Sequence, residues 1–226
     1  MRKLIVAEFL TLDGVMEASE EWQPPYVSED VAEAIQASIH ASEAMLLGRV
    51  TYELFASYWP TQTKNEFGVA DKMNSQPKFV VSSTLDKAAW NNTTLIKGNV
   101  IEEIRRPKQQ PGGDIRLSGS ATLAQALMQP GLVDAYWLLV HPLVRGRGKR
   151  LFADGTAMAG LKLVESKAFR SGAVLLRYEP DHWRIGAGDE RRHAVDWWHH
   201  PGSGNHALRS VLFVRAGESL QARLTP

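Results

Sequence analysis

The chain has no cysteine among its 226 residues, which excludes disulfide bonds, thiolate metal sites and cysteine nucleophiles. It also has no apolar run near the roughly 20 residues that a membrane-spanning helix needs. The apolar run at the N-terminus is too short for a signal peptide, because Glu8 and Asp13 follow too soon. We therefore expect a soluble, cytoplasmic protein.

A strong net charge is lacking as well. The formal charge is +1, with 44% apolar and 23% charged residues, which gives no reason to expect nucleic acid or a membrane surface as partner. The apolar content is enough for a proper core. A small-molecule substrate is the partner that we expect.

The composition changes near residue 181, so we expect a domain over 1–180 and an extension of unknown role over 181–226. The extension shows no sustained hydrophobic period, and we expect it to be poorly ordered. Val211-Leu212-Phe213-Val214 could add one strand. The pair His199-His200 invites a metal-binding interpretation, but no ligand spacing supports it, and we expect no metal. The extension holds five of the seven histidines: His182, His193, His199, His200 and His206.

Apolar runs of strand length alternate with amphipathic helical segments up to residue 180. This pattern predicts an α/β fold with a mainly parallel sheet, closed by an antiparallel hairpin that turns at Ser171-Gly172. We expect loops over 15–27 and 61–76, and a helix from Val100 that breaks at Pro107. The expected strands are 4–9, 44–47, 78–84, 93–96, 115–117, 135–140, 161–169 and 173–178.

One strand–turn–helix segment stands out at residues 115–128. Gly119 permits a tight turn after the strand, and Ser120 can cap the helix that follows. A helix N-terminus presents free backbone N–H groups and a positive dipole end, which suit an anion such as a pyrophosphate. Taken alone, the same pattern is more typical of an ordinary connection that binds nothing, because a single Gly-Ser turn is a weak signal.

A second segment of this kind begins at Gly48, where Arg49 and Thr51 open another helix. Arginine binds phosphate in a bidentate manner, and a threonine hydroxyl can donate to it. Two such segments in one domain strengthen the prediction of an anion site.

The first strand ends at Asp13-Gly14. Asp13 either forms the turn or lies at the mouth of a cleft, because ligands of open α/β sheets bind beyond strand ends. The loop with Trp22 could line that cleft or pack on the body of the protein. The basic, glycine-rich loop 141–150 is most simply a solvated connection.

These motifs resemble the bacterial dihydrofolate-reductase-like family that includes the reductase domain of the riboflavin-biosynthesis deaminase/reductase. The matching pieces occur in the family's order and cover residues 1 to about 180. They are residues 12–14 (LDG), 47–53 (LGRVTYE) with 58–60 (YWP), 79–85 (FVVSSTL), 117–123 (LSGSATL) and 131–152 (GLVD, then HP, then GRGKRLF).

The resemblance implies a dihydrofolate-reductase-like fold and NADPH as hydride donor. It implies that Arg49 contacts the 2′-phosphate and that Ser82 and Ser83 lie by the adenosine ribose phosphate. The remaining implied cofactor residues are Gly48 and Thr51 at one turn and Gly119, Ser120, Ala121 and Thr122 at the other. The family commonly has paired glycines, often after a glutamate, where this chain has Ser118-Gly119-Ser120.

With this resemblance, we expect an NADPH-dependent reductase of a small heterocyclic substrate. The substrate could be a ribosylamino-pyrimidine (a 5-amino-6-(5-phosphoribosylamino)uracil reductase-like activity), a pterin or another small carbonyl or imine. Asp13 is the candidate for proton supply or substrate binding, and Trp22 and Trp59 are candidate cleft walls. The alternative is a nucleotide-binding protein that keeps the fold and has lost the reaction. The sheet edges also leave a homodimer open.

Overall fold

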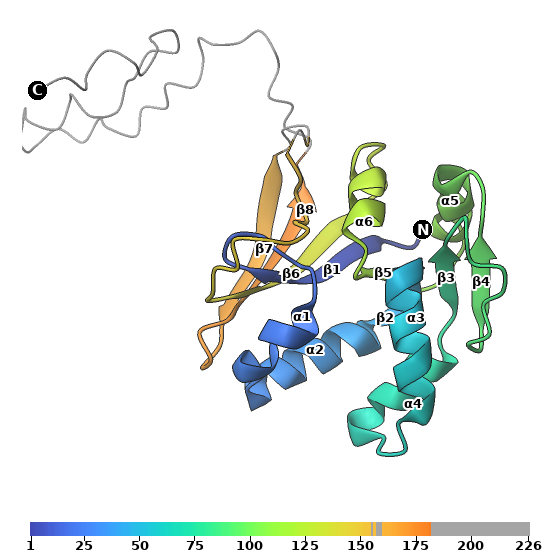
Figure 1. Cartoon of the computed structure of the whole chain (residues 1–226). Coiled ribbons are helices and arrows are strands. Elements are labelled where there is room, and N and C mark those ends of the chain that lie inside the picture. The colour runs from blue at the N-terminus through green and yellow to red at the C-terminus, as the bar shows by residue number, and fades with distance from the viewer. Residues whose placement is uncertain (155, 157–159, 182–226) are drawn as a thin grey trace, which may run out of the picture. The chain divides into compact units, whose positions relative to one another are not determined.

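The computed structural model describes residues 1–154, 156 and 160–181. They form an eight-stranded sheet with helices on both faces (Figure 1). The strands are β1 Leu4–Thr11, β2 Ser42–Gly48, β3 Lys78–Val81, β4 Thr93–Ile96, β5 Asp114–Ser118, β6 Ala135–His141, β7 Leu161–Ala168 and β8 Val174–Pro180. The α-helices are α1 Ser19–Trp22, α2 Glu29–Ala41, α3 Arg49–Tyr58, α4 Val69–Ser75, α5 Val100–Gln109 and α6 Ala121–Met128.

The sheet has the order β4-β3-β2-β5-β1-β6-β8-β7. β1 runs parallel to β5 and β6, and β2 runs parallel to β3 and β5. β8 is antiparallel to β6 and β7. The expected mainly parallel sheet with a C-terminal antiparallel hairpin is confirmed. Because β1, β2 and β5 are parallel, their carboxyl ends meet at one edge of the sheet.

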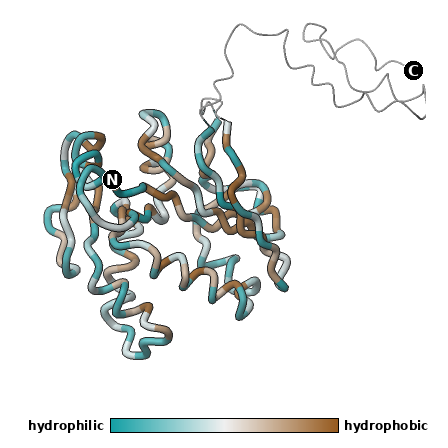
Figure 2. Tube along the Cα trace, turned by 180° about the vertical axis from the view of Figure 1, so that it is seen from behind, coloured by the Kyte–Doolittle hydropathy of each residue, from teal (hydrophilic) through white to brown (hydrophobic). Residues whose placement is uncertain are grey.

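Alternating side chains divide the core between the two faces of the sheet. On β2, Ala44 and Leu46 pack in the cluster that includes residues of α5 and α6, whereas Met45 and Leu47 pack in the cluster that includes residues of α3 and α4. A strand buried on both faces is a continuous apolar run, and the central strands carry the hydrophobic stretches seen in Figure 2. No helix in the described ranges is long and apolar enough to cross a membrane.

Several elements differ from the sequence-based expectations. The segments expected as loops contain α1, α4 and two short 3-10 helices, Pro24–Tyr26 and Glu66–Gly68. A third 3-10 helix, Trp59–Thr61, follows α3 and leads into the second of these segments. The helix expected to break at Pro107 continues to Gln109. Proline removes one backbone donor, and so near a helix end it costs a single hydrogen bond.

The strand expected to reach residue 84 ends at Val81. Ser82 turns the chain there, because its Oγ accepts hydrogen bonds from the backbone N–H groups of Thr84 and Leu85, at 3.2 and 2.9 Å. The extension from 182 to 226, with its histidines and the strand expected at 211–214, lies outside the described residues.

Candidate active site: a cavity at the ends of the central strands

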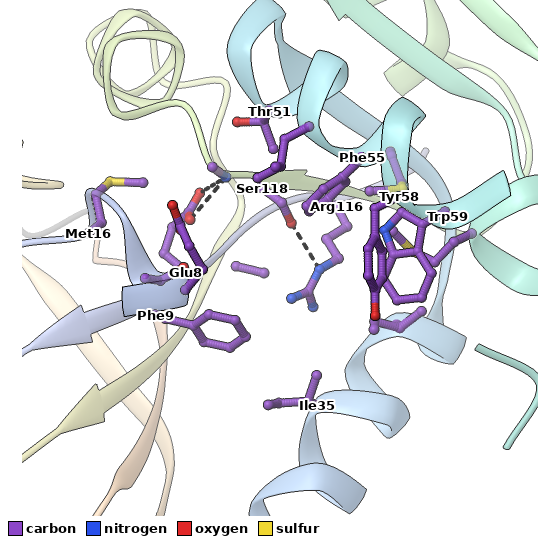
Figure 3. Close-up of a pocket in the computed structure, with 18 of the residues that line it drawn as sticks. Glu8, Phe9, Met16, Ile35, Thr51, Phe55, Tyr58, Trp59, Arg116 and Ser118 are labelled. Carbon is purple, nitrogen blue, oxygen red and sulfur yellow. Dashed lines mark hydrogen bonds between the residues drawn. The ribbon is translucent and has the colours of Figure 1, made fainter. Parts of the chain in front are cut away.

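A cavity of about 880 Å³ lies where β1, β2 and β5 end (Figure 3). Its lining comes from these strands, from the first turns of α3 and α6, and from the sides of α2, α3 and α4. The volume falls within the range of small-molecule and cofactor sites, roughly 300–1,000 Å³. Its position at the carboxyl ends of parallel strands is the usual ligand position in open α/β sheets.

The two glycine turns predicted as anion sites touch each other in this cavity. A Cβ on Gly48 would lie 2.7 Å from both Cβ and Oγ of Ser120. A Cβ on Gly119 would lie 2.6 Å from Cγ2 of Thr51 and closer still to its Oγ1. Gly119 also has a φ of +88°, which favours glycine. The two turns therefore form one composite surface at the start of α3 and α6.

The first turn of α6 presents backbone donors to this surface. The Oγ of Ser120 accepts from the N–H of Leu123 at 3.3 Å, so the expected cap is present. The N–H groups of Ala121 and Thr122 have no hydrogen-bond partner within the described part of the chain, as expected of a helix N-terminus. With the dipole of α6, these donors suit an anion.

Arg49 lies at the start of α3, on the rim of the cavity. Its side chain is 44% exposed and pairs with Glu53 one turn further along the helix, at 2.8 Å. An exposed pair of this kind is weak, and so Arg49 can exchange it for a phosphate. Gly48, Arg49, Thr51, Gly119, Ser120, Ala121 and Thr122 all line the cavity.

Glu8 is a cavity residue that the sequence alone did not single out. It lies on β1 between apolar neighbours and is 5% exposed. The register of β1 with β5 pairs Val6 with Leu117, and so Glu8 lies level with Gly119, where β5 has ended. The N–H of Gly119 donates to both carboxyl oxygens, at 2.8 and 3.0 Å (Figure 3). Burial raises the pKa of Glu8 to about 8.

Arg116 is a second buried charged residue in the lining. It lies on β5 with Nε donating to the Oγ of Ser118 at 3.1 Å and Nη1 donating to Ser38 on α2. Its guanidinium carbon is 5.4 Å from the ring centre of Trp137. Burial lowers the pKa of Arg116 to about 10, and the nearby charge of Glu8 acts in the opposite direction. At neutral pH Arg116 is therefore a cation inside the cavity.

The part of the cavity between α2, α3 and α4 is mainly apolar and aromatic. Trp59 lines it beside Tyr58, with ring centres 5.1 Å apart, and Phe55 packs edge-on against Trp59 at 6.4 Å. Ile35 faces them from α2 in Figure 3. Trp59 thus lies in a wall of this cavity. Flat side chains of this kind suit a planar ring.

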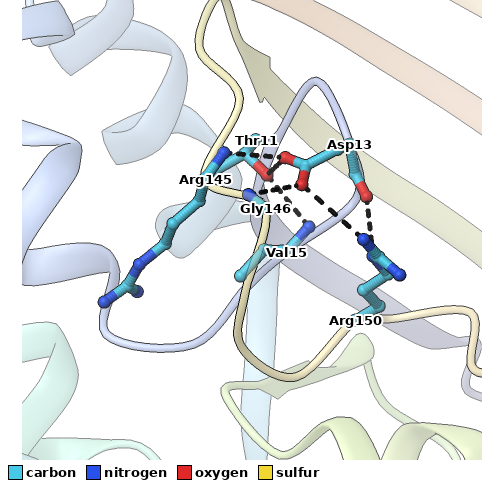
Figure 4. A network of polar contacts seen from close by, with 6 residues as sticks. All are labelled: Thr11, Asp13, Val15, Arg145, Gly146 and Arg150. Carbon is cyan, nitrogen blue, oxygen red and sulfur yellow. Dashed lines mark hydrogen bonds and ion pairs between the residues drawn. The ribbon is translucent and has the colours of Figure 1, made fainter.

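Asp13 does not line the cavity. Its carboxylate accepts hydrogen bonds from Thr11 Oγ1 at 2.6 Å, from the N–H of Arg145 at 3.1 Å and from the N–H of Gly146 at 2.9 Å (Figure 4). Arg150 adds an ion pair at 3.8 Å. These hydrogen bonds, that of Thr11 first, hold the pKa of Asp13 well below its usual range. Geometrically, Asp13 joins the end of β1 to the basic loop.

Three other expected site residues also lie outside the lining. Trp22 is buried against His141, with ring centres 5.2 Å apart, and its Nε1 donates to the carbonyl of Glu17 at 3.0 Å. Ser82 follows β3 and caps its own turn, while Ser83 is exposed beside it. Among the described residues, no group of three histidine, aspartate or glutamate side chains could hold a metal ion.

Residues 2–175 match the model of the RibD C-terminal domain. The chain belongs to the RibD C-terminal domain family. It is 33% identical over 187 residues to the uncharacterized protein YyaP of Bacillus subtilis (strain 168), covering 80% of this chain and 95% of that protein.

Two solved structures share the fold of this RibD C-terminal domain. A Shewanella sp. PV-4 protein described as a riboflavin biosynthesis protein has a TM-score of 0.63 at 18% identity, covering 79% of this chain and 99% of that one. Dihydrofolate reductase from Enterococcus faecalis, complexed with NADP(H), has a TM-score of 0.52 at 13% identity, covering 79% and 96%. The dihydrofolate-reductase-like fold is therefore confirmed, and family membership supports a reductase-like role.

Proposed function

We propose that this protein is an NADPH-dependent reductase of a small heterocyclic substrate. The observation that carries the proposal is the contact between the two glycine turns, which brings two helix N-termini to one cavity. A dinucleotide carries several phosphate groups, and two adjacent sets of backbone donors suit them better than one. The structural likeness to a reductase complexed with NADP(H) supports the choice of cofactor.

The residues fit this cofactor on the chemistry of their donors. Within the described residues, the N–H groups of Ala121 and Thr122 have no partner and can donate to the pyrophosphate, and Thr51 adds a hydroxyl. Arg49 provides an exposed guanidinium for the 2′-phosphate of the adenosine ribose. When bound, the nicotinamide supplies the hydride, and the protein positions the acceptor and provides a proton.

The substrate in this proposal occupies the apolar part of the cavity. Phe55 and Trp59 on one side and Ile35 on the other can enclose a planar ring such as a pyrimidine or a pterin. Arg116 would lie at the polar end of this space, where it can donate to a carbonyl oxygen of the ring.

The proton requires an acid in the cavity. Asp13, the acid expected from the sequence, lies outside the lining and is held ionised by its hydrogen bonds. Glu8 lines the cavity, and with its pKa raised to about 8 it is largely protonated at neutral pH. In this proposal Glu8 takes the place of Asp13 as the candidate acid.

Binding and turnover should be measured on the same protein. Nicotinamide fluorescence reports NADPH binding, and the loss of NADPH absorbance reports oxidation in the presence of ribosylamino-pyrimidine and pterin acceptors. We expect saturable binding and oxidation with at least one acceptor class. Binding without oxidation by any of them would favour the alternative of a nucleotide-binding protein that has lost the reaction. Absence of binding would reject both.

A further inference from the structure

The N–H of Gly119 already has a partner in this structure. It donates to both carboxyl oxygens of Glu8, whereas the N–H groups of Ala121 and Thr122, within the described part of the chain, have none. Gly119 belongs to the same turn that starts α6. The carboxyl group of Glu8 therefore accepts from one of the backbone donors of the turn where the proposed function places a nucleotide phosphate.

Two anions at one backbone turn repel each other strongly when water is excluded. Glu8 is 5% exposed, so little solvent can screen its charge. A phosphate bound at the turn can coexist with Glu8 only when the carboxyl group is neutral. A neutral carboxyl group can still accept from an N–H, and it gains an O–H that can donate.

The lining of the cavity also contains basic residues that could attract an ionised Glu8. Arg116 faces the site from β5 and stabilises the ionised form of Glu8 electrostatically. Arg49 and Lys149 reach the lining from α3 and from the basic loop, paired with Glu53 and Glu17 respectively. The described structure contains no ion pair between Arg116 and Glu8. The attraction to Arg116 therefore lowers the pKa of Glu8 by less than burial raises it.

We propose that Glu8 is a proton-carrying residue of the nucleotide site, whose ionised form takes up one proton from solvent when a nucleotide phosphate binds at the Gly119 turn. The step converts a carboxylate to a carboxylic acid and involves no redox change. This inference rests on the proposed function, because it requires that a nucleotide binds in the cavity. It assigns Glu8 a role in binding in addition to its candidacy as the acid of the reaction.

The coupling predicts that the affinity for the nucleotide falls as pH rises. With a pKa of about 8 in the free protein, Glu8 is mostly protonated at pH 7 and mostly ionised at pH 9. If only the protonated form is competent, the apparent affinity falls by roughly tenfold between these two pH values. The pyrophosphate of NADPH does not titrate in this range, and its 2′-phosphate, with a second pKa of about 6, is already mostly ionised at pH 7. The nucleotide itself therefore adds little to the change.

The test is isothermal titration calorimetry of NADPH at pH 7, 8 and 9, in two buffers with different ionisation enthalpies. The difference between buffers gives the number of protons taken up. For wild type we expect an uptake near zero at pH 7 that approaches one proton at pH 9, with the loss of affinity given above. For Glu8→Gln we expect no uptake at this site and less than about a twofold change of affinity.

Glu20→Gln is the matched control, because Glu20 also lines the cavity but is exposed and, within the described residues, makes no hydrogen bond or ion pair with the Gly119 turn. It should retain the proton uptake of wild type. Urea unfolding of each variant confirms that it is folded. Tight binding at pH 9 without proton uptake, or the same uptake at pH 9 in Glu8→Gln as in wild type, would overturn this inference alone. Failure of the wild-type protein to bind NADPH at any pH would overturn the proposed function with it.

Discussion

Gly48 lies directly against Ser120, so that a Cβ added at Gly48 would be 2.7 Å from both Cβ and Oγ of the serine. Gly48 ends β2, and Ser120 caps α6. Their φ values are −81° and −90°, so neither needs the conformational freedom of glycine. The glycine at position 48 is therefore required by the close approach of the two turns.

Gly48→Ala should move the two turns apart. The added methyl group has to displace the α6 cap, and overpacking of this kind typically costs about 1–3 kcal/mol. We expect a lower free energy of unfolding in urea and at least a tenfold loss of NADPH affinity. Gly98→Ala is the control, because a Cβ at Gly98 would meet nothing within 4 Å.

A second substitution identifies the cause of the effect in Gly48→Ala. Adding Ser120→Gly removes the two atoms that the new methyl group would approach, and so it should restore part of the NADPH affinity. Equal NADPH affinity in Gly48→Ala and wild type would show that the contact between the turns does not shape the nucleotide site.

Glu8 should make the stability of the protein depend on pH. Its pKa is about 8 in the folded state against a usual value of 4.5, so between these pH values the folded state holds a proton that the unfolded state has lost. The free energy of unfolding therefore falls as pH rises from about 5 to 8, by up to about 1.4 kcal/mol per pH unit, and levels off above that.

Glu8→Gln removes this titration and keeps an oxygen that can accept from the N–H of Gly119. Urea unfolding at pH 5, 7 and 9 should show the variant gaining stability relative to wild type as pH rises. Glu20→Gln should follow wild type throughout. A constant difference between Glu8→Gln and wild type at the three pH values would mean that Glu8 has an ordinary pKa in the folded protein.

Asp13 should act mainly through the loop that it anchors. Asp13→Asn replaces one acceptor oxygen by an amide donor that would face the N–H of either Arg145 or Gly146. We expect a lower melting temperature and faster proteolysis in the loop 141–150. Because the pKa of Asp13 is lowered on folding, its stabilising effect is present above about pH 4 and is lost as pH falls below that value.

Asp154→Asn provides the comparison for Asp13, since Asp154 is exposed in the segment that follows the same loop. It should leave the melting temperature unchanged. If Asp13→Asn instead keeps full stability and NADPH affinity but loses turnover, then Asp13 is the proton source that the sequence analysis expected, and Glu8 is not.

Much of the fold could be predicted because periodicity and turn residues act locally. The apolar run of β2 and the glycine at its end predict a buried strand followed by a helix, and α6 follows Ser120 as its capping residue indicates. The order of the strands depends on long-range packing, and so does the contact between Gly48 and Ser120. Neither is visible in local patterns.

The two buried charges of the cavity, Glu8 and Arg116, were missed because each has apolar neighbours in its strand. Glu8 follows Ala7 in β1, and Arg116 follows Ile115 in β5, where a charge can be mistaken for a solvent-facing position. Both strands are central, however, and central strands of a mainly parallel sheet are covered on both faces. A single charged residue in such a strand is thus a signal for a cavity, because a buried charge needs partners.

Arg49 offers the most direct test of the nucleotide site. Nicotinamide fluorescence titrations should compare NADPH and NADH on wild type, on Arg49→Ala and on Lys64→Ala, which removes another basic residue of the lining. Loss of a charge-assisted contact to phosphate costs about 1.5–3 kcal/mol, and for a partly exposed arginine we expect the low end, about tenfold in affinity. We predict that Arg49→Ala weakens NADPH binding alone, leaving NADH binding and the Lys64→Ala variant close to wild type. Equal NADPH affinity in wild type and Arg49→Ala, or no binding of either nucleotide, would contradict the placement of the cofactor at the paired turns.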